Sequence, residues 1–220
     1  MSTPDESGEA LARLDEISRR LRVECPWDRE QDERTIVPHT VEEAYELADA
    51  ANRGDDRKLL DELGDVLFQV VFLSILLEER GRGDFAAVAE HCRQKLIRRH
   101  PHVFGDVEAS TAGEVLANWD EIKRGEEGRE PGIFGDVPEN LPGPLYARKL
   151  LRRATSAGVE VEPMPLAEHL DADDFESVGD LLFAAVALAR EKKVDPELAL
   201  RSAADRFRER IEQEESTPSE

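Results

Sequence analysis

Apolar residues recur at helical spacing along most of the chain, and no segment alternates convincingly between apolar and polar positions. The first predicted helix spans about 7–23, and Pro26 ends it because proline cannot continue a helix. A second helix is predicted from about Thr40 to 52–54, where Gly54 supplies a C-cap. The pattern therefore predicts an all-α fold, built as a helical bundle.

Turn and cap signals place the remaining helices. "DDRK" opens a long apolar helix that ends near Arg80, and Asp84 caps the next helix. Thr111 and Glu114 form a T-x-x-E capping box, and Asp195-Pro196 starts the last helix. The predicted ranges are 55–80, 84–99, 145–157, 174–192 and 196–214, and the helix after Thr111 carries Trp119 and Lys123.

Composition shifts suggest how these helices are grouped. The segment "GEEGREPGIFGDVPENLPGP" is rich in Gly, Pro and charge, which is typical of a linker. Polar ends are expected to be disordered. The predicted division is a disordered N-terminus (1–8), a first helical domain (9–125), a linker (126–144), a second helical region (145–214) and a disordered tail (215–220).

The second region is predicted to be a degenerate copy of the first. "ELGDVLFQVVFL" (62–73) reappears as "SVGDLLFAAVAL" (177–188), displaced by 115 residues. Ser177 stands where the first copy has Glu62, and no E-E-x-x-E precedes the second copy. The apolar pattern is kept while this acid motif is lost, so chemistry is expected in the first copy.

Charge limits the choice of partners. Lys plus Arg number 29 and Asp plus Glu number 50, giving a net charge of −21. Such a surface repels nucleic acid and anionic membranes, so neither is an expected partner. The start has no signal-peptide pattern, and the longest apolar run is too short for a membrane span. Cys25 and Cys92 show no metal-ligand spacing, which favours reduced thiols and a cytoplasmic protein.

Five carboxylates stand in "VEEAYELADAANRGDDRKLLDELGD", within two strongly helical segments. Glu42, Glu43 and Glu46 share one face of the first helix, and Glu62 and Asp65, at i and i+3, share a face of the next. Helices joined by a short loop are antiparallel neighbours by default, which brings both acidic faces together. Carboxylates so close repel one another unless cations neutralise them.

Oxygen ligands without His or Cys favour Mg²⁺, with Mn²⁺ as the second choice. A di-iron bundle is disfavoured because no histidine follows a glutamate at Glu-x-x-His spacing. The remaining alternative is a non-catalytic helical module whose acids bind metal or a partner.

The motif E-E-x-x-E (42–46) followed by E-x-x-D (62–65) resembles the signature of the MazG-type nucleoside triphosphate pyrophosphohydrolases. "CPWDREQ", "KLIRRHPHVFG" and "VLANWDEIK" resemble further segments of that family, over about 10–125. The resemblance implies an all-α, usually dimeric enzyme that splits an NTP into NMP and pyrophosphate with Mg²⁺. It also implies a role in clearing non-standard or excess (d)NTPs.

The resemblance also suggests roles for single residues. It implies that Glu43, Glu46, Glu62 and Asp65 are the metal ligands, and that Glu42 assists catalysis as a further ligand or by orienting water. Cations and an indole ring would bind the triphosphate and the nucleoside. The expected substrate-binding residues are Lys58, Lys95, Arg98, Arg99, Trp119 and Lys123. Structural roles stay open for these six: helix-end charges for the cations, and a core or interface position for Trp119.

Overall fold

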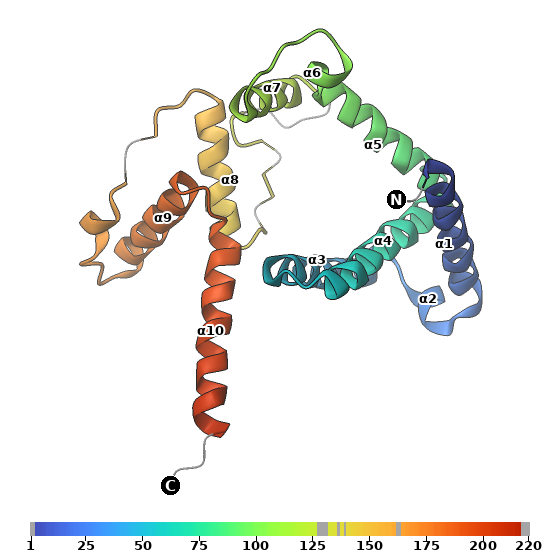
Figure 1. Ribbon diagram of the computed structural model, residues 1–220, viewed down its shortest axis with the longest axis horizontal. Coiled ribbons are helices and arrows are strands. Elements are labelled where there is room, and N and C mark those ends of the chain that lie inside the picture. The colour runs from blue at the N-terminus through green and yellow to red at the C-terminus, as the bar shows by residue number, and fades with distance from the viewer. Residues whose placement is uncertain (1–2, 127–131, 136, 139, 162–163, 217–220) are drawn as a thin grey trace. The chain divides into compact units, whose positions relative to one another are not determined.

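The computed structural model describes residues 3–126, 132–135, 137–138, 140–161 and 164–216, and every regular element in these ranges is a helix (Figure 1). The predicted all-α class is confirmed. The elements are α1 (Pro4–Glu24), α2 (Pro26–Glu30), α3 (Glu33–Arg53), α4 (Asp56–Glu79), α5 (Phe85–Arg99), α6 (Pro101–Phe104), α7 (Ala112–Arg124), α8 (Gly143–Ser156), the 3-10 helix η1 (Leu166–His169), α9 (Phe175–Glu191) and α10 (Pro196–Ser216).

The chain forms two compact units, Met1–Arg98 and Arg99–Glu220. This division lies earlier than the predicted end of the first domain at residue 125. The reason is visible at Asp120 of α7, which contacts α8: its Oδ2 accepts a hydrogen bond from Ser156 Oγ at 2.6 Å. Its Oδ1 also lies 3.8 Å from Arg152 Nη2. α7 therefore packs with the C-terminal elements, and the predicted linker 126–144 lies partly outside the described residues.

Helix α3 begins at Glu33, seven residues before the predicted start at Thr40. Asp32 caps it, because its side chain accepts hydrogen bonds from the backbone N–H groups of Arg34 and Thr35 at 2.8 and 2.9 Å. Pro38 lies inside the helix, where a proline costs about 3 kcal/mol. Ile36, two residues before it, is completely buried, which contributes about 1.5 to 3 kcal/mol in the opposite direction.

Helix α1 also begins earlier than predicted. Thr3 caps it with a reciprocal capping box, in which the Glu6 side chain accepts a hydrogen bond from the Thr3 backbone at 2.7 Å. Residues 4–8, predicted to be disordered, are therefore helical. Other cap predictions agree with the structure: Gly54 takes φ 68° after α3, Thr111 caps α7, and Asp195 precedes α10.

The core of the first unit lies along α4. Phe72 and Ile36 are fully buried and pack with Leu76, and the half-buried Phe68 and Leu73 surround them. Ile36 is near the start of α3 and Phe72 near the end of α4, so the two helices run antiparallel from the Gly54 turn. In the part of the chain that the structure describes, no helix is long and apolar enough to cross a membrane.

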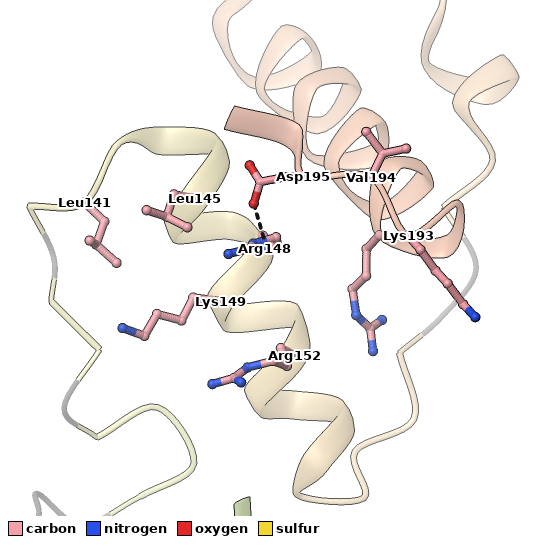
Figure 2. Close-up of a pocket in the computed structure, with 9 residues that line it drawn as sticks. Leu141, Leu145, Arg148, Lys149, Arg152, Lys193, Val194 and Asp195 are labelled. Carbon is pink, nitrogen blue, oxygen red and sulfur yellow. Dashed lines mark ion pairs between the residues drawn. The ribbon is translucent and has the colours of Figure 1, made fainter. Parts of the chain in front are cut away.

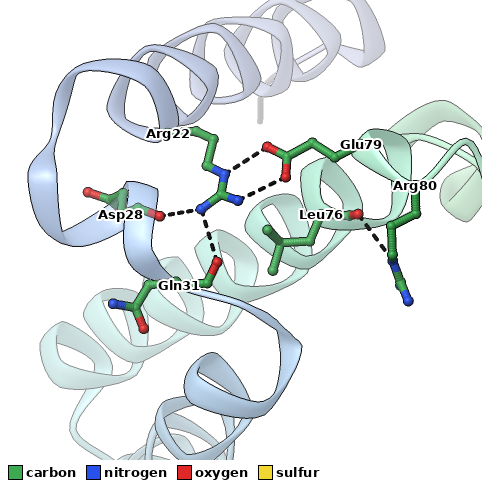
Figure 3. Close-up of polar contacts among 6 residues, drawn as sticks. All are labelled: Arg22, Asp28, Gln31, Leu76, Glu79 and Arg80. Carbon is green, nitrogen blue, oxygen red and sulfur yellow. Dashed lines mark hydrogen bonds and ion pairs between the residues drawn. The ribbon is translucent and has the colours of Figure 1, made fainter.

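Arg22 of α1 ties α1, α2 and α4 together (Figure 3). Its guanidinium forms a bidentate pair with Glu79, with distances of 2.7 and 2.8 Å. It also donates to the backbone carbonyls of Asp28 and, at 3.0 Å, Gln31. Arg22 additionally lies over the Phe72 ring, 5.8 Å from its centroid. This network holds α1 against the end of α4 that is remote from the Gly54 turn.

We expect Glu79→Gln to lower the free energy of unfolding by about 1 to 2 kcal/mol at pH 7, which is less than for a buried pair because Glu79 is 45% exposed. The Arg22 guanidinium lowers the pKa of Glu79. An acid with a lowered folded pKa stabilises the fold above its ordinary pKa and loses that contribution as pH falls.

The difference between wild type and Glu79→Gln should therefore shrink as the pH is lowered below about 4.5, as urea unfolding curves would measure. Glu24→Gln is the matched control, because Glu24 pairs with Arg20 on the exposed surface of α1 alone. An equal loss of stability in the control would contradict a specific role for the Arg22 network.

Candidate metal centre

The α3–α4 hairpin brings three carboxylates together. The ligand oxygens of Glu43, Glu62 and Asp65 all lie within 4.8 Å of one another. Glu43 comes from the middle of α3, whereas Glu62 and Asp65 are one turn apart on α4. Helical spacing on each element and the antiparallel packing of the two elements together create this cluster.

The two remaining acids of the motif border the cluster. Glu46 is exposed, and its charge raises the pKa of both Glu43 and Glu62. Glu42 is also exposed and raises the pKa of Glu43 less strongly. Its Oε2 lies 3.8 Å from Nδ1 of His39, a neighbour that the sequence reasoning did not include. His39 in turn makes an edge contact with the Trp27 ring.

Electrostatics disfavour the ionised cluster when no cation is bound. Burial, followed by the charge of Glu46, raises the pKa of Glu62. Burial, followed by the charge of Asp65, raises the pKa of Glu43. Glu43 and Glu62 thus lie where their own negative charge is unfavourable, and a divalent cation would reverse that.

Glu62 carries the strongest sign of an unmet ligand. It is buried, with only 4% of its surface exposed, whereas glutamates are almost always exposed to solvent. Lys58 Nζ lies 3.8 Å from its Oε1, which is longer than a hydrogen bond. Among the described groups, none donates a hydrogen bond to its buried Oε2. Buried polar atoms are normally satisfied, so this oxygen is available to a cation.

The donor set suits a hard divalent cation. Three carboxylates supply oxygen ligands only, which Mg²⁺ and Mn²⁺ prefer over the nitrogen and sulfur ligands typical of Zn²⁺. Three protein ligands leave coordination positions for water and for phosphate oxygens, as is usual for Mg²⁺. The residues present therefore fit such an ion.

The predicted substrate-binding residues divide between the two units. Lys58, Lys95 and Arg98 belong to the unit that holds the acids, where Lys95 is half-buried and Arg98 exposed on α5. The second unit holds Arg99, Trp119 and Lys123.

Within the second unit, Arg99 and Trp119 contact each other. The Arg99 guanidinium lies 5.5 Å from the Trp119 ring centroid, and His100 meets the same ring edge-on at 4.8 Å. Arg99 is largely buried and pairs with Glu126, whose Oε1 accepts a hydrogen bond from Arg99 Nε at 2.9 Å. This arrangement gives Arg99 a structural partner, and a substrate role for the pair stays a prediction.

The second copy lacks the cluster for a reason visible at its helix start. Ser177, which corresponds to Glu62, sits in the first turn of α9 and forms a capping box with Asp174. The Asp174 side chain accepts from Ser177 N at 2.7 Å, and Ser177 Oγ accepts from Asp174 N at 3.1 Å. In the first copy, α4 begins at Asp56, well before Glu62. α9 thus lacks the turn that precedes the acid in α4.

The part of the chain that holds the acidic cluster matches a known protein family. Residues 31–104, which include all of α3 to α6, match the model of the MazG nucleotide pyrophosphohydrolase domain. A nucleoside triphosphate pyrophosphohydrolase of Escherichia coli K12 is 38% identical to the chain, over 93% of the chain and 87% of that protein. The chain belongs to the MazG family.

A second MazG relative, the nucleoside triphosphate pyrophosphohydrolase/pyrophosphatase of Thermotoga maritima, is 37% identical over 96% of the chain and 87% of its own length. Among solved structures, a mazG-related protein from Thermotoga maritima aligns with 51% of the chain and 97% of its own length, at 25% identity and a TM-score of 0.45. The MazG match includes all five acids of the predicted motif.

Proposed function

We propose that this protein hydrolyses nucleoside triphosphates to nucleoside monophosphates and pyrophosphate, using Mg²⁺ or, less well, Mn²⁺. The observation that carries the proposal is the convergence of Glu43, Glu62 and Asp65, with an unpartnered buried oxygen on Glu62. The MazG relatives named nucleoside triphosphate pyrophosphohydrolases support the substrate class.

In this proposal Glu43, Glu62 and Asp65 hold the cation, and Glu46 completes the ligand set from the next turn of α3. A divalent cation bound there would lower the pKa of a water molecule and offset charge on the attacked phosphate. Glu42, exposed at the edge of the cluster, orients that water or accepts its proton.

The cationic side chains are assigned to the phosphates. Lys58, one turn before Glu62 and 3.8 Å from its Oε1, would bind a phosphate oxygen. We assign Lys95, Arg98, Arg99 and Lys123 to the leaving pyrophosphate, whose negative charge grows in the transition state. Trp119 offers an indole face for the nucleoside.

The active species is proposed to be a homodimer.

The test is an assay of purified protein with Mg²⁺ and a panel of NTPs and dNTPs, with the products separated by chromatography. NMP and pyrophosphate are expected in equal amounts, because water attacks the α–β linkage. NDP and phosphate would instead indicate cleavage of the β–γ linkage. If no nucleotide is cleaved although Mg²⁺ binds, the non-catalytic module becomes the better explanation of the acids.

A further inference from the structure

The second unit contains a basic pocket of about 570 Å³ between α8 and the end of α9 (Figure 2). This volume lies in the usual range for small-molecule sites. Its lining residues fall between Leu141 and Asp195, so the pocket shares no residue with the acidic cluster. They are Leu141, Leu145, Arg148, Lys149, Arg152, Arg190, Lys193, Val194 and Asp195.

One face of α8 supplies most of the cations. Leu145, Arg148, Lys149 and Arg152 follow one another at helical spacing, so all four lie on the same stripe of the helix. Figure 2 shows Lys149 and Arg152 projecting from the same side of α8. From Arg148 to Arg152 the helix rises by about 6 Å, so these charges form an extended row rather than a single point.

The balance of charge in the pocket is opposite to that of the whole chain. Five of the nine lining residues are cationic and Asp195 is the one acid among them, in a protein with a net charge of −21. Asp195 is engaged with Arg148, whose Nη1 lies 2.7 Å from its Oδ2. Asp120 lies near Arg152, at 3.8 Å. The nine lining residues thus carry more positive than negative charge.

Side-chain contacts of Asp195 and Arg190 hold the wall opposite α8 in place. Asp195 caps α10, accepting hydrogen bonds from the backbone of Glu197 and Leu198 at 3.0 and 3.1 Å, while it also pairs with Arg148. Arg190 donates to Thr155 Oγ1 of α8 at 2.9 Å. The pocket is thus held by contacts at both of its walls.

Lys193, at the rim of the pocket, has a left-handed backbone conformation that is unusual for a residue other than glycine. It adopts φ 58° after α9, and the backbone N–H of Val194 bonds to the Ala189 carbonyl at 2.8 Å, as in a Schellman motif. Glycine is favoured at this position, because other residues are strained there. A lysine at this place keeps a cation at the rim of the pocket instead.

We propose that this pocket binds a phosphorylated organic anion, without a metal ion, with its phosphates against the α8 cations. Arginine and lysine are the side chains that recognise phosphate best, and a row of them suits linked phosphates. Leu141, Leu145 and Val194 provide apolar surface for the organic part of the ligand. The proposal does not depend on the hydrolytic function of the acidic cluster.

The test is calorimetric titration of the full chain carrying Glu62→Gln, in EDTA, with inorganic tripolyphosphate and separately with ATP. Without divalent cations the acidic cluster repels both anions, and the part of the binding heat that the α8 substitutions below remove reports on the basic pocket. We expect saturable binding of one anion per chain that weakens as salt is added. ATP should bind more tightly than tripolyphosphate, because its nucleoside can cover the apolar lining.

The double substitution Lys149→Ala/Arg152→Ala should weaken ATP binding at least about tenfold, because it removes two charged contacts. Lys192→Ala is the matched control: it removes a neighbouring exposed lysine that does not line the pocket, and binding should be unchanged. Circular dichroism checks that each variant is folded, and Lys149→Gln/Arg152→Gln repeats the test with less loss of side-chain volume.

Absence of saturable binding in EDTA would overturn the proposal. So would equal affinities of the Glu62→Gln chain with and without the folded double substitution, or an equal loss in the Lys192→Ala control. Tripolyphosphate binding as tightly as ATP would overturn the role of the apolar lining. None of these outcomes bears on hydrolysis, which is measured separately with Mg²⁺ and an intact Glu62.

Discussion

Glu62→Gln is expected to reduce kcat/KM for triphosphate hydrolysis by at least about 100-fold. Loss of residues that only support a metal ligand commonly costs 10- to 100-fold, so loss of a ligand itself should cost at least the upper value. The substitution keeps the shape of the side chain and removes its charge. Steady-state kinetics with Mg²⁺ and the preferred triphosphate would measure the effect.

The same variant should also separate metal binding from folding. Because burial and neighbouring acids raise the pKa of Glu62, its charge is unfavourable in the metal-free protein. In EDTA we therefore expect the Tm of Glu62→Gln to equal or exceed that of the wild type. Mg²⁺ should raise the Tm of the wild type, since it binds only the folded state, and should raise that of the variant much less.

Glu9→Gln is a suitable control, because Glu9 is exposed on α1 and pairs only weakly, at 3.6 Å, with Arg13. It should leave activity and Mg²⁺ stabilisation unchanged. Retention of full activity by Glu62→Gln would contradict the role of the cluster in hydrolysis. A marked loss of stability in EDTA would instead show that Glu62 acts in folding.

Phe72→Ala should lower the free energy of unfolding by about 3 to 5 kcal/mol, the usual range for truncating a buried phenylalanine. Phe72 is fully buried among Ile36, Leu76 and Phe68, and Arg22 lies over its ring. The cavity would remove packing contacts between α3 and α4 at the end remote from the Gly54 turn. Urea unfolding followed by helical circular dichroism measures the loss.

The matched control is Phe175→Ala, since Phe175 begins α9 with 97% of its surface exposed. The same atoms are removed without a cavity, so the expected change is within about 0.5 kcal/mol. Similar losses in both variants would mean that aromatic content matters more than packing around Phe72.

The sequence predicted those parts of the fold that depend on local chemistry. The starts of α4, α7 and α10 followed from Asp and Thr caps, and the end of α3 followed from Gly54, because cap hydrogen bonds reach only a few residues along the chain. The start of α3 was placed too late, because the burial of Ile36 that offsets Pro38 involves α4, far away in sequence.

In the candidate site, too, local sequence features were predictable and long-range packing was not. Helical spacing and a short turn were enough to place Glu43, Glu62 and Asp65 together. They could not reveal that Glu62 is buried while Glu42 and Glu46 are exposed, because exposure depends on the packing of the hairpin. The pairing of Arg99 with Glu126 and the basic pocket were also missed, since both join segments that are distant along the chain.

The capping box of α9 limits what a single substitution could add to the predicted second copy. Replacing Ser177 with glutamate would restore the motif in the sequence, yet the new acid would sit in the first turn of a helix rather than in its interior. A glutamate at this third helical position would take part in the capping box instead, as Glu6 does in α1. Regaining a metal site there requires a longer helix and a facing acidic helix, so no single substitution can restore it.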